Sequence, residues 1–103
     1  MTEFIKVGTK ADFKDGMLTG IQVKGHPVCI AHAAGTFYAF DDTCTHAQAL
    51  LSRGDLEDGA EAVCPLHGAR FSITTGEALT PPAVKPVRTF AVKVEGEDIF
   101  VEV

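Results

Sequence analysis

Hydrophobic and polar residues alternate in two segments near the end of the chain. The first segment runs from Phe90 to Val94 and the second from Ile99 to Val103, with the sequence Glu-Gly-Glu-Asp between them. A period of two places alternate side chains on opposite faces of a β-strand. Two such segments around a short glycine-containing loop predict an antiparallel hairpin.

Four further strand-like segments occupy the first part of the chain, separated by short breaks that contain glycine. We expect these strands at Phe4–Val7, Leu18–Val23, Val28–His32 and Thr36–Phe40. We also expect a brief helical turn near Lys10–Lys14, with Thr9 as its N-cap. Short strands at this spacing favour a β sandwich or barrel.

Strand periodicity nearly vanishes in the middle of the chain, from Asp41 to about Pro82, where only residues 61–63 and 70–74 are strand-like. We therefore predict an all-β protein with a single domain, residues 1–103. Its antiparallel sandwich base would comprise residues 1–42 and 84–103. A small loop-rich subdomain, about residues 43–83, would be inserted between these two parts.

Length and charge limit the classes of function. A chain of 103 residues with 46% hydrophobic residues has the size and composition of one globular domain. A net charge of −5 argues against binding to nucleic acid or to an anionic membrane surface. The sequence begins without the basic start and apolar run of a signal peptide, and it lacks the roughly 18 apolar residues of a membrane span. We expect a cytoplasmic protein.

Two pairs of metal-binding side chains lie in the loop-rich middle section: Cys44 with His46, and Cys64 with His67. Each pair offers one thiolate and one imidazole. This set suits a Rieske-type [2Fe–2S] centre, in which one iron takes two thiolates and the other takes two imidazoles. Ligands one or two residues apart straddle two irons more easily than they share one. We therefore expect the cysteines to bind one iron and the histidines the other, in a centre that transfers single electrons.

Two other interpretations of these four residues remain open at this point. A structural zinc site also uses two cysteines and two histidines, but its usual order is two cysteines followed by two histidines at wider spacing. The alternating order here departs from that pattern. Alternatively, the four residues are unconnected and serve only the local structure. A red-brown colour would distinguish a [2Fe–2S] protein from a colourless zinc module.

Two segments of the sequence resemble the cluster-binding loops of Rieske proteins. They are residues 44–54, CTHAQALLSRG, and residues 64–71, CPLHGARF. Thr75-Gly76 and Pro81-Pro82-Ala83 resemble the family's following turn and the proline loop that covers the cluster. The resemblance runs from about residue 40 to the C-terminus. It is nearest to the small Rieske ferredoxins of bacterial ring-hydroxylating dioxygenase systems, which serve aromatic compound degradation.

The resemblance implies a Rieske-like β sandwich with an inserted cluster-binding subdomain and one [2Fe–2S] cluster per chain. Its ligands would be Cys44, His46, Cys64 and His67. It further implies a monomeric electron carrier without a catalytic site of its own. A flavoprotein reductase that uses NAD(P)H would supply the electrons, and a terminal oxygenase would receive them. An alternative is the Rieske small subunit of another oxidoreductase, such as nitrite reductase.

The same resemblance places the two histidines nearest the surface, as the port for electrons. An apolar rim for a transient partner would come from Leu66, Pro81 and Pro82. Respiratory Rieske proteins carry two extra cysteines, which form a disulfide, where this chain has Ala49 and Leu66. They also carry serine and tyrosine hydroxyls where this chain has Ala69 and Phe71. Without those hydroxyl donors we expect a reduction potential near the low end of the Rieske range, roughly −150 to +300 mV.

Two further features have both a structural and a functional interpretation. Cys29 lies in an apolar run, so we expect a buried core residue and not a redox thiol. An acidic stretch separates the two ligand pairs and is either a solvated loop or a surface that steers a basic partner. It consists of Asp55, Glu57, Asp58 and Glu61, with Asp41 and Asp42 just before the first pair.

Overall fold

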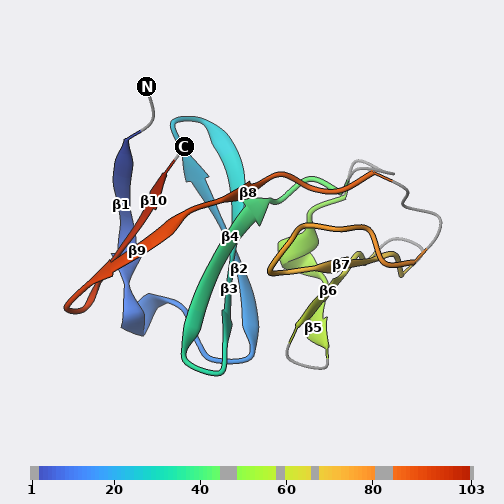
Figure 1. Ribbon diagram of the computed structural model, residues 1–103, viewed down its shortest axis with the longest axis horizontal. Helices are drawn as coiled ribbons and strands as arrows, with labels where there is room; N and C mark the ends of the chain where they lie inside the picture. Colours follow the sequence, from blue (N-terminus) through green and yellow to red (C-terminus); the bar gives the residue numbers. More distant parts are fainter. Residues whose placement is uncertain (1–2, 45–48, 58–59, 66–67, 81–84, 103) are drawn as a thin grey trace.

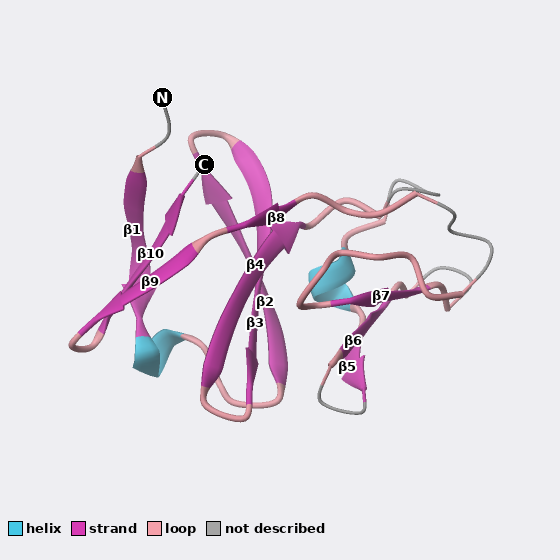
Figure 2. Ribbon diagram, in the orientation of Figure 1, coloured by secondary structure: helices cyan, strands magenta, loops and turns pink. Residues whose placement is uncertain are grey.

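A computed structural model of the chain describes residues 3–44, 49–57, 60–65, 68–80 and 85–102. These residues form β-strands and two short 3-10 helices (Figures 1 and 2). The strands make three antiparallel sheets, and this all-β architecture confirms the predicted fold class. No helix among the described residues is long and apolar enough to cross a membrane.

Two of the sheets form the base of the molecule. The first has the order β1-β10-β9 and comprises β1 (Phe4–Thr9), β10 (Asp98–Glu102) and β9 (Val92–Glu95). The second has the order β2-β3-β4-β8 and comprises β2 (Met17–Val23), β3 (His26–Ala33), β4 (Thr36–Asp41) and β8 (Thr89–Phe90). Ile99 and Val101 of the first sheet share a core with Val28 and Ile30 of the second. The base is therefore the predicted β sandwich.

Strand β3 contributes to two different cores because both of its faces are covered. Val28 and Ile30 point into the sandwich core, while Cys29 and Ala31 belong to a second core that also contains the side chains of the inserted section. All four side chains are fully buried. A strand buried on both faces is expected to be continuously apolar, and the run from Val28 to Ala31 has that composition.

The third sheet lies at the opposite end of the molecule from the first (Figure 1). It comprises β5 (Asp55–Glu57), β6 (Glu61–Val63) and β7 (Arg70–Ser72), and the 3-10 helix η2 (Leu51–Arg53) precedes it. All of these elements come from the middle section of the chain. This sheet and the base share the second hydrophobic core, so the inserted section packs directly on the face of β3.

Strand β5 was not predicted, because its acidic sequence favours a solvated loop. It forms because Leu56 pairs with Ala62 of β6 and packs against the second core, while the acidic residues on either side of Leu56 remain more accessible. A single apolar residue in a three-residue strand is too short a pattern to be recognised as an alternation.

The strand expected from Phe90 to Val94 is interrupted at Ala91. Before the interruption, Phe90 pairs with Ala39 of β4, and after it Val92 pairs with Val101 of β10. The chain thus passes from one sheet of the sandwich to the other, and this switch depends on tertiary pairing that a local pattern does not contain. The strand expected at residues 70–74 ends at Ser72, because the Gly76 N–H donates to the Ser72 carbonyl in a turn.

The helical turn expected near Lys10–Lys14 is the 3-10 helix η1 (Lys10–Asp12). Thr9 is its N-cap, as predicted, and it forms a capping box with Asp12. The Asp12 carboxylate accepts hydrogen bonds from the Thr9 N–H, at 2.8 Å, and from the Thr9 hydroxyl, at 3.2 Å.

Candidate metal centre

The first ligand loop begins at Cys44, shortly after the end of β4. The Cys44 N–H donates to the Ala49 carbonyl at 2.9 Å, and Thr43 forms an isolated β-bridge with Leu50. These contacts close the loop at its base. The Cys44 side chain is buried in the second hydrophobic core, at 3% exposure. The first predicted thiolate ligand is therefore held by backbone pairing on both sides of its loop.

The second ligand loop repeats this arrangement. Cys64 follows β6 directly, and its N–H donates to the Ala69 carbonyl at 2.7 Å, again five residues further along the chain. Val63 pairs with Arg70 just outside the loop. Cys64 is 1% exposed and belongs to the same hydrophobic core as Cys44. Both cysteines thus stand at the first position of a short, closed loop, with buried thiols.

The other predicted ligands, His46 and His67, lie outside the described residues, as do Leu66, Pro81 and Pro82 of the expected rim. Within the described parts of the chain, no group of three or more histidine, cysteine or acidic side chains is arranged to hold a metal ion. The two cysteines supply the thiolate half of the predicted set. Burying two thiolates in an apolar core is costly unless positive charge compensates them, and ferric iron supplies that charge. The donor set therefore fits an iron–sulfur cluster.

Gly54 brings the two ligand loops into contact. It ends η2, and its backbone lies against the Val63 carbonyl, immediately before Cys64. A β-carbon built on Gly54 would collide with that carbonyl oxygen. The missing side chain therefore lets the end of the first loop pack on the start of the second, which fixes the two loops relative to each other.

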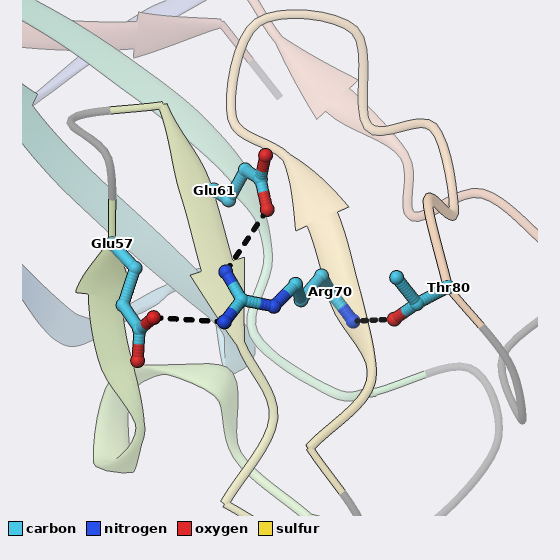
Figure 3. Close-up of polar contacts among 4 residues, drawn as sticks. All are labelled: Glu57, Glu61, Arg70 and Thr80. Carbon is cyan, nitrogen blue, oxygen red and sulfur yellow. Dashed lines mark hydrogen bonds and ion pairs between the residues drawn. The ribbon is translucent and has the colours of Figure 1, made fainter.

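Arg70 connects three segments of the inserted section (Figure 3). Its guanidinium donates to Glu57 of β5 at 2.8 Å and to Glu61 of β6 at 3.1 Å, and its backbone N–H donates to the Thr80 hydroxyl at 3.0 Å. The hydrogen bonds to Glu57 and then to Glu61 raise the pKa of Arg70. Arg70 thereby ties the strand after the second ligand loop both to the hairpin beside it and to the segment that leads toward residues 81–84.

The acidic stretch is less exposed than its sequence suggests. Glu57 and Glu61 are paired with Arg70, and Asp42 is buried at 2% exposure. Asp41 lies in contact with Arg88 of the base, at 3.6 Å. Asp55 is exposed, and Asp58 lies outside the described residues. Most of the described carboxylates of this stretch therefore have structural partners, whereas Asp55 is exposed beside the loops.

Three other positions singled out in the sequence are fully buried: Ala69, Phe71 and Cys29. Ala69 and Phe71 flank Arg70 and pack in the core that contains both ligand cysteines. Cys29 is a core residue, as predicted. Burial, and to a lesser extent the charge of Asp42, raises the pKa of the Cys29 thiol, which keeps it protonated and inert.

Comparison with known proteins agrees with this geometry. Residues 3–91 match the family model for the Rieske [2Fe-2S] domain. The 3-phenylpropionate/cinnamic acid dioxygenase ferredoxin subunit of Shigella boydii is 43% identical over 93 residues, which cover 89% of this chain and 86% of that protein. The corresponding subunit of Escherichia coli has the same identity and coverage.

Solved structures show the same relationship. The ferredoxin of carbazole 1,9a-dioxygenase from Nocardioides aromaticivorans is 35% identical, with a TM-score of 0.91 over 95% of both chains. A ferredoxin in complex with the oxygenase of carbazole 1,9a-dioxygenase is 34% identical, with a TM-score of 0.89, and the match covers 95% of this chain and 91% of that one. A nitrite reductase small subunit from Mycobacterium tuberculosis, at 20% identity, shares the fold. This chain therefore belongs to the Rieske [2Fe–2S] family, and its cofactor is a [2Fe–2S] cluster.

Proposed function

We propose that this Rieske ferredoxin receives single electrons from a flavoprotein reductase that uses NAD(P)H. It would pass them to a terminal ring-hydroxylating oxygenase in the cytoplasm. The observation that carries the proposal is the pair of buried thiols on two loops with identical closure, Cys44 to Ala49 and Cys64 to Ala69. The relatives named as dioxygenase ferredoxins support the choice of oxygenase as partner, and one of them occurs in a complex with its oxygenase.

We further propose that Cys44 and Cys64 bind one iron of the cluster and that His46 and His67 bind the other. The cluster supplies the one-electron chemistry when it is bound. The protein's contribution is to bury the thiolate side in an apolar core and to leave the other side near the surface. Pro65 and Gly68, which flank residues 66–67, are exposed, and so is Leu79. Exposed apolar residues at these positions suit a weak and transient electron-transfer partner.

Spectroscopy and reconstitution test this proposal together. The purified protein should be red-brown, contain two irons and two acid-labile sulfides per chain, and give a Rieske-type EPR signal after reduction with dithionite. It should also shuttle electrons between the reductase and oxygenase components of a 3-phenylpropionate dioxygenase system. A colourless zinc-containing protein, or an EPR-silent one with intact iron and sulfide, would contradict the assignment of the site.

The alternative function, a permanently bound small subunit of nitrite reductase, has only the shared fold in its support. The two functions differ in how the protein associates with its partner. An electron carrier should elute as a monomer and turn over many times between separate reductase and oxygenase components. Co-purification of the native protein in a stable complex with one large reductase would favour the alternative.

Ala69 and Phe71, which carry no hydroxyl group, lead to a prediction about the reduction potential of the cluster. We expect the double variant Ala69→Ser, Phe71→Tyr to have a higher potential than the wild type. A hydroxyl donor stabilises the more negative, reduced cluster, and both side chains lie in the dry core with the ligand cysteines. Spectroelectrochemical titration measures the change. Phe90→Tyr, on strand β8 of the base, adds a hydroxyl away from that core and should leave the potential unchanged.

Asp55 provides a test of electrostatic steering. We expect rising ionic strength to slow reduction of the protein by its reductase, and we expect Asp55→Asn to make this salt dependence shallower. Asp55 is exposed beside the ligand loops, whereas Glu57 and Glu61 share an ion pair with Arg70. Stopped-flow rates at several salt concentrations measure the slope. Asp98→Asn, in the first sheet of the base, is the control, and a slope that changes equally in both variants would argue against steering at Asp55.

A further inference from the structure

Asp42 is the only charged side chain that is fully buried among the described residues, at 2% exposure. It lies between the end of β4 and Cys44. Its carboxylate accepts two hydrogen bonds from Ser52 of η2, one from the backbone N–H and one from the hydroxyl, each at 2.7 Å. The Asp42 carbonyl also accepts from the Leu51 N–H at 2.7 Å. The start and the end of the first ligand loop are joined by these contacts.

Gly20 of β2 supplies the space for this pair. A β-carbon at Gly20 would lie 2.5 Å from the Ser52 hydroxyl oxygen and 2.8 Å from the Asp42 carboxylate, too close for either atom. The backbone of Gly20 has no left-handed conformation that would itself require glycine. The missing side chain at Gly20 thus fits the space that the Asp42 and Ser52 side chains occupy. A built polar site requires such a fit, and a carboxylate buried by chance would lack it.

The charge of Asp42 is compensated by neutral donors only, as far as the described residues show. Ser52 provides both hydrogen bonds, and hydrogen bonds donated to a carboxylate stabilise its charged form. Asp42 lies beside the second core, and after burial itself its charge contributes to the raised pKa of the Cys29 thiol there. Cys44 belongs to the same core, and two residues of chain keep its Cα atom within about 7 Å of that of Asp42.

The neighbouring Asp41 offers a natural comparison. Its carboxylate contacts the His26 ring and the Arg88 guanidinium, and its side chain is 24% exposed. Its charge is therefore paired with a cation and screened by water, although it lies only one residue further from Cys44. The two consecutive aspartates differ in burial and pairing much more than in their distance along the chain from the first ligand loop.

We propose that Asp42 is a positioning residue that holds the first ligand loop and lowers the reduction potential of the cluster. Reduction transfers one electron from the reductase to the cluster and breaks no bond in the protein. A fixed, buried negative charge beside that core opposes the added charge, so it favours the oxidised state. The inference rests on the proposed role of Cys44 as a ligand, and it assigns a function to a carboxylate that does not itself touch the iron.

Three conservative variants separate the effect of the charge on the reduction potential from the effect of the structural contact. Asp42→Asn keeps the shape and can still pair with Ser52, but it removes the charge, so the potential should rise. Ser52→Ala keeps the charge and removes one donor that stabilises it, so the potential should fall. Asp41→Asn removes the screened charge and should shift the potential less than Asp42→Asn does. Redox titration measures each potential, and thermal unfolding of the same samples measures stability.

The signs of the shifts decide the outcome. If the Asp42–Ser52 contact were purely structural, Asp42→Asn and Ser52→Ala would shift the reduction potential in the same direction. Both variants would also lose stability. Shifts of the same sign, or a shift for Asp41→Asn as large as that for Asp42→Asn, would overturn the proposal. Should Asp42→Asn fail to fold, Ser52→Ala alone decides, since only a fall in its potential agrees with an electrostatic role. A wild-type protein without a cluster would instead contradict the proposed function.

Discussion

The Cys64→Ala variant will be colourless when purified, without the visible absorption or the EPR signal of the wild type. On the proposed ligand set, one thiolate is then missing, and a methyl group cannot replace it at iron. Cys64 sits at the first position of its loop, and its thiol is buried in the same core as that of Cys44. Water has little access to this position, so no solvent ligand readily takes the place of the thiolate. We expect complete loss of the cluster.

Cys29→Ala is the matched control for this experiment. Cys29 is also fully buried and belongs to the same hydrophobic core, so the substitution removes the same atom from a similar environment. We expect it to keep the full content of iron and acid-labile sulfide, with a loss of about 1–2 kcal/mol in stability. Far-UV circular dichroism confirms that each variant folds. Retention of a normal cluster in Cys64→Ala, or its loss in Cys29→Ala, would show that the thiolate ligands are wrongly assigned.

The roles predicted for the three cysteines rest on different signals in the sequence. Cys44 and Cys64 each stand near a histidine, and this spacing distinguished them from Cys29, which lies within an apolar run. Burial does not separate the three, since all of them are buried in one core. The ligand assignment of Cys44 and Cys64 therefore rests on the chemistry of their neighbouring residues and stays a prediction. The sandwich base was also predictable from local sequence. Its strands show either alternation of polar and apolar residues or continuous apolar runs.

Most of the features that the sequence did not predict depend on pairing or packing partners outside the element itself. The switch between sheets at Ala91 and the short strand β5 depend on pairing partners. Likewise, the Asp42–Ser52 pair has room because Gly20, which lies on the separate strand β2, carries no side chain. Polar residues in loops favour solvent when each is considered alone. Their burial becomes evident only when the fold brings the hydrogen-bond partners together.

Gly54→Ala is expected to be strongly damaging, although Gly54 binds no metal. The backbone of Gly54, with a φ of −93° and a ψ of −159°, lies in an extended conformation that alanine also adopts. Conformational strain therefore contributes little. The cost comes from the collision of the new β-carbon with the Val63 carbonyl. Because that oxygen belongs to the backbone of β6, one of the two ligand loops has to move away from the other.

The displacement should appear in both stability and cluster retention. Overpacking of this kind lowers stability by about 1–3 kcal/mol. Here the strand that leads to Cys64 has to shift to relieve it. We expect a lower unfolding temperature at a fixed scan rate and a shorter half-life of the visible absorption in the presence of an iron chelator. Gly35→Ala is the control, because Gly35 has a φ of +82° and open space at its β-carbon. Gly35→Ala should lose about 1 kcal/mol of stability because alanine disfavours a left-handed backbone, but its β-carbon collides with nothing.

A comparison of the two glycine variants distinguishes general destabilisation from displacement of the loops. If Gly54 only maintains the fold, both variants should lose their cluster at rates that follow their unfolding temperatures. If contact between the loops holds the two thiolates at the correct separation, Gly54→Ala should release iron faster than its unfolding temperature explains. The second result is the one that the close approach of Gly54 to Val63 predicts, since the change moves the residue directly before Cys64. Equal behaviour of the two variants would limit Gly54 to a general role in packing.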